Sequence, residues 1–180
     1  MELINYAPKD LTLGQIVSIN HLTDSTWPES ATRSSEQEKV DEFYARHTGK
    51  TCHCVFSGKE LIGFAESFPL TIKIVNEQTE VMGIGGVCVD PDHRGKGLGA
   101  KLVLEAFKQI DKGEYPLSIF QTGVPGFYEK LGCRVIKNKI INSKNKENPK
   151  TNPFWDDYVM IYPARFLWPS GTIDLLGPGF

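Results

Sequence analysis

Hydrophobic and polar positions follow helical spacing in the first quarter of the chain and strand-like runs after it. Apolar residues recur every three to four positions from residue 11 to about 21, and again from Ser34 to about Arg46, which predicts two helices. The second helix has a candidate capping box formed by Ser35 and Glu38. We expect three of its residues to face inward: Val40, Phe43 and Tyr44.

The rest of the chain shows apolar runs separated by turn-forming residues. The predicted strands are residues 52–56, 61–68, 70–75, 80–84, 87–89, 117–120, 136–141 and 157–162. Turns at 57–60 and 76–79 join the first two pairs of strands, and the polar loop 142–152 precedes the last strand, which we expect to pair with 136–141. The pair Gly85-Gly86 interrupts the strand that begins at residue 80, and glycine at such a place marks a bulge or a close approach of the backbone. This order of elements predicts an α/β sandwich around a mixed, mainly antiparallel sheet.

The most informative segment, residues 85–107, leads from a buried strand through a loop into a glycine-rich turn that opens a helix. The turn reads Arg94-Gly95-Lys96-Gly97-Leu98-Gly99-Ala100. Such a turn presents bare backbone N–H groups at a helix N-terminus, where the helix dipole favours anions. Glycines also let a pyrophosphate approach the main chain closely, so we expect a phosphorylated ligand here.

Several kinds of phosphate-binding turn were compared by spacing. A P-loop is excluded because no Gly-Lys in this segment is followed by Ser or Thr. A dinucleotide motif is formally matched by Gly95, Gly97 and Ala100, but five residues separate its first glycine from the strand. The next strand also ends in Gln121, where an acidic residue is expected. An ordinary turn before an amphipathic helix would not require this order of glycines.

The remaining pattern, V-x-V-x-P-x-x-R-G-x-G-L-G starting at Val87, resembles the acetyl-CoA signature of the GNAT superfamily of N-acyltransferases. A second segment, the string FYEKLGCRV that begins at Phe127, is similar to the family's F-Y-x-K-x-G-F segment, and Gly132 stands where a helix C-cap glycine is expected. Two motifs in this order are more specific than either alone. The resemblance covers about residues 61–135.

The resemblance implies one N-acetyltransferase domain over residues 1–180, with a three-layer α/β/α fold whose central sheet is splayed at the cofactor strand. It also implies the groups that bind acetyl-CoA. Main-chain groups of Val87, Cys88 and Val89 would contact the acyl and pantetheine part, and the pyrophosphate would contact the turn residues Arg94, Gly95, Lys96, Gly97, Leu98, Gly99 and Ala100. Tyr128 would be the general acid that protonates the leaving thiolate; alternatively, it forms a core aromatic pair with Phe127.

The activity implied is acetyl-CoA-dependent transfer of an acyl group to a primary amine of a small molecule, by direct attack on the thioester. Many relatives have a carboxylate just before V-x-V, where this chain has Gly85-Gly86. The general base therefore stays open among five candidates: Glu66, Asp156, Asp157, His53 and the carboxylate of Phe180. The alternative function is a catalytically inactive acyl-CoA-binding module.

The last residues, 168–180, are rich in aromatic residues, proline and glycine, unlike a solvated chain end. The string WPSGTID is similar to the tail of the nodulation N-acyltransferase. The pair Asp156-Asp157 together with the tail resembles the aminoglycoside 2′-N-acetyltransferases more loosely, although the missing acid before V-x-V argues against a polycationic acceptor. We expect the tail to be ordered and to line the acceptor cleft, or else to cover a sheet edge.

Composition limits the classes of partner. A net charge of −2 over 180 residues provides no basic field for nucleic acid, and no apolar run is long enough to span a membrane. We expect a cytoplasmic protein, and a homodimer is compatible with the family. The cysteines are expected to be buried free thiols without a metal, because no second Cys/His pair completes four ligands. They are Cys52, Cys54, Cys88 and Cys133.

Overall fold

The computed structural model describes residues 1–28, 35–75 and 77–180. They form two compact units: the first contains Met1–Phe68 and Ile84–Ala106, and the second contains Pro69–Gly83 and Phe107–Phe180. Three elements run from one unit into the other: strand β3 (Glu60–Ile74), strand β4 (Glu77–Val89) and helix α3 (Leu98–Asp111).

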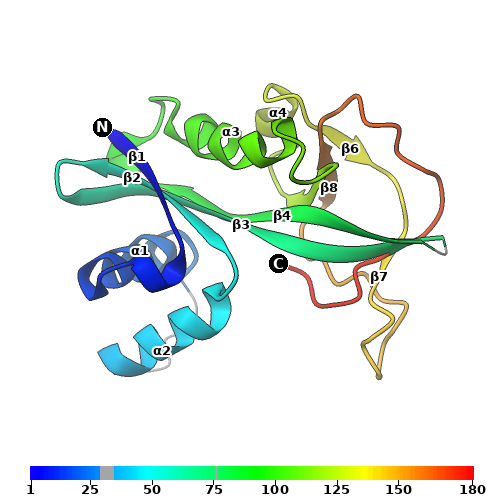
Figure 1. Cartoon of the computed structure of the whole chain (residues 1–180), viewed down its shortest axis with the longest axis horizontal. Coiled ribbons are helices and arrows are strands. Elements are labelled where there is room, and N and C mark those ends of the chain that lie inside the picture. Colours follow the sequence, from blue (N-terminus) through cyan, green and yellow to red (C-terminus); the bar gives the residue numbers. More distant parts are fainter. Residues whose placement is uncertain (29–34, 76) are drawn as a thin grey trace. The chain divides into compact units, whose positions relative to one another are not determined.

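The first unit has three layers (Figure 1). Its remaining elements are β1 (Glu2–Tyr6), α1 (Leu13–Thr26), α2 (Glu36–His47), β2 (Thr51–Ser57) and the short 3-10 turns Pro8–Asp10 and Pro91–His93. The strands lie in the order β1-β2-β3-β4, and β2 is antiparallel to both β1 and β3. Helices α1 and α2 pack on one sheet face over Cys52, Cys54 and Phe64, whereas Leu98 and Leu102 of α3 pack on the other.

The predicted helices are present, with one error of orientation. The capping box of α2 is formed: Ser35 Oγ accepts from the Glu38 N–H at 3.2 Å, and the Glu38 carboxylate accepts from the Ser35 N–H. Val40 and Phe43 are buried as expected. Tyr44 is exposed, because it lies one position further around the helix from the buried Phe43, to whose ring it is edge-on. The predicted start at Ser34 lies outside the described residues.

The hairpin of strands 52–56 and 61–68 is confirmed. The predicted strands 61–68 and 70–75, however, form a single strand, β3. β3 continues through Pro69 to Ile74, and because β2 pairs with it only as far as Ser67, the missing N–H of proline costs no bond on that side. Of the expected turn at 76–79, Asn76 lies outside the described residues and 77–79 belong to β4. The glycine pair does not interrupt the strand as expected, because β4 runs unbroken from Glu77 to Val89; Gly86 has a φ of +60° within it.

The strands of the second unit follow the order β3-β4-β5-β8-β6. Its own elements are β5 (Ser118–Thr122), α4 (Pro125–Glu129), β6 (Arg134–Ile136), β7 (Ile140–Ile141), β8 (Tyr158–Tyr162) and β9 (Ile173–Asp174). β5 and β6 are antiparallel to β8, whereas β5 is parallel to β4. That parallel pairing ends at Gly83 with Ile119 although β4 runs on to Val89, so the predicted mixed, mainly antiparallel and splayed sheet is confirmed.

The C-terminal part of the chain differs from its predicted pairing. The expected strand 136–141 is two short strands: β6 pairs with β8, but β7 pairs with β9 of the tail. β9 also pairs with β3, through Ile173 beside Ile74. Ile173 and Leu175 are fully buried in the core of the second unit. The tail is therefore ordered, as expected, and covers a sheet edge; its place in an acceptor cleft stays a prediction.

Candidate functional site

The glycine-rich turn is anchored to the end of β4 by side chains of the turn itself. Arg94 Nε donates to the carbonyl of Val89 at 3.0 Å, and Lys96 Nζ donates to the carbonyl of Asp92 at 3.1 Å. The Asp90 carboxylate accepts from the Asp92 N–H at 2.9 Å and lies 3.1 Å from His93 Nδ1. These bonds fix the direction in which the chain enters helix α3.

Two glycines give the turn a shape that other residues adopt rarely. Gly95 and Gly97 have φ angles of +75° and +77°, both are exposed, and no atom of the described chain lies within 4 Å of where their Cβ would stand. α3 begins just after Gly97, whose carbonyl accepts from the Lys101 N–H at 3.0 Å. The N–H groups of the first helical turn have no acceptor within the helix. The turn residues therefore fit a phosphate group bound through the main chain.

The sequence-predicted strand residues lie next to this turn in the first unit. Cys88 is buried against α1 and α2, and burial raises the pKa of its thiol to about 12, so it remains protonated at neutral pH. Val87 and Val89 pack on the opposite face, toward α3. The structure thus brings all the predicted cofactor-binding residues, from Val87 to Ala100, together in one unit.

Tyr128, the predicted general acid, belongs to the second unit. It lies on α4 and is 7% exposed, with ring centroids 4.7 Å from Phe120 and 4.9 Å from Phe127. Burial, and then the nearby Cys133 and Asp156, raise the pKa of its hydroxyl. The phenol therefore keeps its proton at neutral pH, as a proton donor must. Its packing also agrees with the aromatic-pair alternative.

Among the candidate bases, His53 has both ring nitrogens already engaged in hydrogen bonds. Its Nδ1 donates to Asn5 Oδ1 at 2.8 Å, because the Asn5 amide nitrogen itself donates to Glu105. Its Nε2 therefore accepts from Ser67 Oγ at 2.9 Å. Burial lowers the pKa of His53 to about 4. A neutral, buried and fully bonded imidazole of this kind is structural.

The candidates of the second unit have other surroundings. Asp156 is partly buried and its N–H donates to Gln121 Oε1, whereas Asp157 is exposed. The main-chain oxygen of Phe180 accepts from Gln121 Nε2, and the Phe180 ring lies edge-on to Phe154.

Glu66 on β3 lies in a cluster that sequence reasoning did not find. Its Oε1 accepts from Lys50 Nζ at 2.8 Å, and its Oε2 lies 3.3 Å from His47 Nε2. All three side chains are largely shielded from solvent, with exposures of 12% for Glu66, 14% for His47 and 21% for Lys50. His47 and Lys50 carry no motif, so only the fold shows that they meet Glu66.

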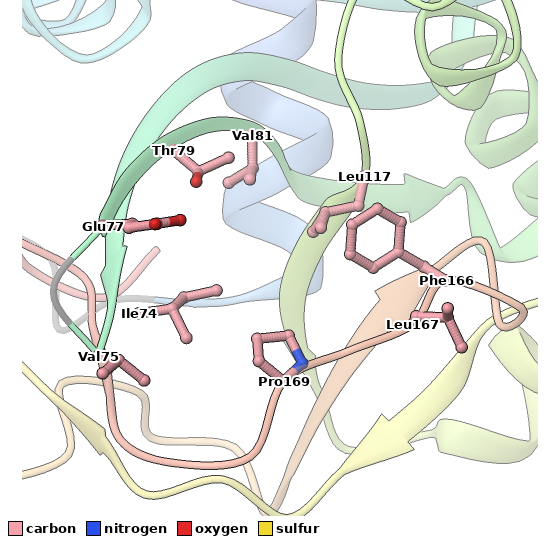
Figure 2. A pocket seen from close by; sticks show the side chains of 9 residues that line it. All are labelled: Ile74, Val75, Glu77, Thr79, Val81, Leu117, Phe166, Leu167 and Pro169. Carbon is pink, nitrogen blue, oxygen red and sulfur yellow. The ribbon is translucent and has the colours of Figure 1, made fainter.

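The second unit also contains a cavity of about 630 Å³ (Figure 2). Its walls come from the end of the β3–β4 hairpin, from the residue before β5 and from the segment after β8. The lining residues are Ile74, Val75, Glu77, Thr79, Val81, Leu117, Phe166, Leu167 and Pro169. The walls are mostly apolar, with one carboxylate, and include none of the predicted site residues.

The cysteines are free and buried, as expected: Cys52, Cys54, Cys88 and Cys133. Within residues 1–28, 35–75 and 77–180, no group of three or more His, Cys, Asp or Glu side chains is arranged to hold a metal ion. No helix of the described segments is both long and apolar enough to cross a membrane.

Comparison with known proteins identifies the family to which this fold belongs. The Acetyltransferase (GNAT) domain family matches residues 7–136, which include β4, the glycine turn, α3 and the Tyr128 segment. No curated protein matches the sequence. A GCN5-related N-acetyltransferase from Kribbella flavida is 20% identical with a TM-score of 0.58, over 74% of this chain and 33% of that one. The chain thus spans a third of that relative's length.

Two further solved structures are similar over most of their own length. An acetyltransferase from Trypanosoma brucei is 23% identical with a TM-score of 0.57, over 76% of this chain and 96% of that one. A GNAT family acetyltransferase from Brucella melitensis, solved in complex with acetyl-CoA, is 19% identical with a TM-score of 0.54, over 74% and 83%. Since the family match spans well over half of the chain, the chain belongs to the GNAT acetyltransferase domain family.

Proposed function

We propose that the protein is an acetyl-CoA-dependent N-acetyltransferase that transfers the acetyl group to a primary amine of a small molecule. The observation that carries this proposal is the turn between β4 and α3, where exposed Gly95 and Gly97 at positive φ precede the bare N–H groups of a helix. This turn lies inside the family match, which supports acetyl transfer from an acyl-CoA.

Acetyl-CoA bound at this turn would supply an activated acetyl thioester. The main chain of residues 94–100 would neutralise the pyrophosphate, and the main chain of Val87 to Val89 would hold the pantetheine amides. An amine then attacks the thioester carbonyl directly, which requires a proton acceptor for the amine and a proton donor for the sulfur. Tyr128 is the proposed donor, because a phenol is protonated at neutral pH and Tyr128 stands in the segment that resembles the family's F-Y-x-K-x-G-F.

The same proposal extends to the organisation of the chain and its location. Residues 1–180 would act as one N-acetyltransferase domain. The four buried, unpaired thiols suit a reducing compartment, so we place the protein in the cytoplasm.

The test measures thiol release from acetyl-CoA in the presence of tyramine, agmatine, glucosamine and lysine, with the acetylated product identified by mass spectrometry. Tertiary-amine analogues, which have no N–H to lose, are the matched control and should release no thiol. Calorimetric titration with acetyl-CoA accompanies the assay. Binding without thiol release from any amine would favour the acyl-CoA-binding module instead, and absence of binding would overturn both functions.

A further inference from the structure

In the cluster of Glu66, His47 and Lys50, two hydrogen-bond acceptors face each other without a proton to share: His47 Nε2 and Glu66 Oε2. His47 Nδ1 lies 2.7 Å from the carbonyl of Phe43, which can only accept, so Nδ1 carries the ring proton. In the neutral imidazole Nε2 therefore presents a lone pair, and it faces Glu66 Oε2 at 3.3 Å. Among the described residues, that carboxylate oxygen is buried without a hydrogen-bond partner.

The neutral form of His47 is favoured by its packing. Its ring is stacked on Phe43 with centroids 4.0 Å apart and lies edge-on to Phe64. Burial lowers the pKa of His47, against the raising effect of the Glu66 carboxylate. One added proton would turn the contact between Oε2 and Nε2 into a hydrogen bond and relieve a buried unpaired oxygen. The pair is therefore arranged to take up one proton.

The other oxygen of Glu66 faces the cofactor strand. A Cβ at Gly85 would stand 3.4 Å from Glu66 Oε1, and a Cβ at Gly86 would stand 3.7 Å from Glu66 Cγ. The glycine pair thus places no side chain of its own between the carboxylate and β4. Gly85 lies two residues before Val87, where the proposed acyl-binding main chain begins.

We propose that Glu66 and His47 together accept the proton that the amine loses during acetyl transfer, an inference that rests on the proposed function. The amine nitrogen forms a bond to the acetyl carbon, the bond from that carbon to sulfur breaks, and the electron pair leaves with the sulfur. The amine proton passes to Glu66 Oε1. Rotation about the broad terminal torsion of the side chain brings it between Oε2 and His47 Nε2. The amine proton is then released to solvent, and this loss balances the proton that the leaving sulfur gains to become a thiol.

Three further groups set the charge around this pair. Lys50 donates to Oε1 and lies 4.6 Å above the Phe68 ring centroid, so a positive charge lies directly beside the carboxylate. Arg46, on the same helix as His47, lowers the pKa of the imidazole further, as does Lys50. Cys52 lies opposite Glu66 on β2 and stays a thiol, because burial and the carboxylate raise its pKa to about 12.

The kinetic test uses Glu66→Gln with an amine that the wild-type protein acetylates. We expect kcat at pH 7 to fall about 10²- to 10⁴-fold with unchanged affinity for acetyl-CoA, the usual contribution of a general base. Glu60→Gln, an exposed carboxylate at the start of the same strand, is the matched control and should leave kcat unchanged. Full turnover of Glu66→Gln, confirmed folded by its melting curve, would overturn the inference.

The role of His47 is tested by titration of its imidazole by NMR. We expect its midpoint to fall in Glu66→Gln, because the carboxylate that raises it is lost, and the acid limb of kcat/KM to shift in His47→Gln. A midpoint that does not move in Glu66→Gln shows that no proton is shared and overturns the inference, even where the wild-type protein is active. Wild-type protein that binds acetyl-CoA and acetylates no amine overturns the proposed function instead.

Discussion

Gly85 of β4 faces the Glu66 carboxylate of β3 so closely that a methyl group at Gly85 would touch Oε1, at 3.4 Å. The φ of Gly85 lies outside the left-handed region, so alanine is compatible with the backbone. We predict that Gly85→Ala slows acetyl transfer about tenfold by covering the proposed proton acceptor. The same change should stabilise the fold by about 0.5 kcal/mol, since it restricts the unfolded chain.

Steady-state kinetics and chemical denaturation measure the two effects separately. Gly14→Ala is the control, because Gly14 lies in α1 with no described atom within 4 Å of its Cβ position. It should stabilise the protein similarly and leave kcat unchanged. Normal turnover in Gly85→Ala would show that Oε1 does not accept the proton from this side.

Gly97→Val should abolish measurable binding of acetyl-CoA. Gly97 has a φ of +77°, which costs a side-chain-bearing residue about 1–2 kcal/mol, and relaxing it would redirect the N–H groups of the turn. Calorimetric titration measures the affinity. Gly113→Val is matched for strain, with a φ of +80° at the far end of α3, and should destabilise the fold but bind acetyl-CoA normally. Equal affinities in the two variants would place the phosphate site elsewhere.

The features that the sequence predicts well depend on residues that are neighbours in the chain. Ser35 and Glu38 satisfy each other's N–H groups within one helical turn, so the start of α2 depends on no distant contact. The turn at Gly95 and Gly97 is likewise local, because positive φ angles favour glycine wherever the rest of the chain lies. For this reason the shape of the glycine turn and the fold class could be predicted.

What could not be predicted depends on pairing between distant segments. His47 and Glu66 lie on a helix and a strand with no shared motif, and they meet only because α2 packs over β3. β3 continues through Pro69 with β4 as its neighbour in the sheet, against the local preference for a break. β9 likewise depends on its partners, since a two-residue strand has almost no signal of its own.

Tyr128→Phe should lower kcat about 10- to 1000-fold while leaving the affinity for acetyl-CoA nearly intact. The change removes the proposed proton donor but keeps the ring that packs on Phe120 and Phe127. Tyr158→Phe, at an exposed position on β8, is the control and should have full turnover. Undiminished kcat in Tyr128→Phe would make this tyrosine a packing residue, as in the alternative interpretation of the motif.

The buried imidazole of His53 should make stability depend on pH. Its pKa is lowered to about 4 by burial, whereas in the unfolded chain it is about 6.5. Between these values the unfolded state binds a proton that the folded state does not. The free energy of unfolding should therefore fall as pH decreases from 6.5 to 4, by about 3 kcal/mol at roughly 1.4 kcal/mol per pKa unit.

Urea denaturation at several pH values measures this dependence, and His53→Gln is the variant to compare. Glutamine can still bond to Asn5 and Ser67 but does not titrate, so its stability curve should be flatter between pH 4 and 6.5. The same slope in both proteins would assign the acid sensitivity to other groups.

The tail should be required for folding of the second unit. Ile173 and Leu175 are fully buried, and Asp174 Oδ1 accepts from the N–H groups of Ser143 and Leu176 at 2.9 and 3.0 Å. Deleting residues 170–180 removes β9 from the edge of β3 and exposes this core, so we expect the truncated protein to lose cooperative melting. The milder Ile173→Ala should lower the free energy of unfolding by about 2–5 kcal/mol. Leu167→Ala, at a position that is 94% exposed, is the control and should change it little. A truncated protein that melts like the full chain would show that β9 contributes little to stability. The tail would then be left with the role predicted from its sequence, which is to line the acceptor cleft.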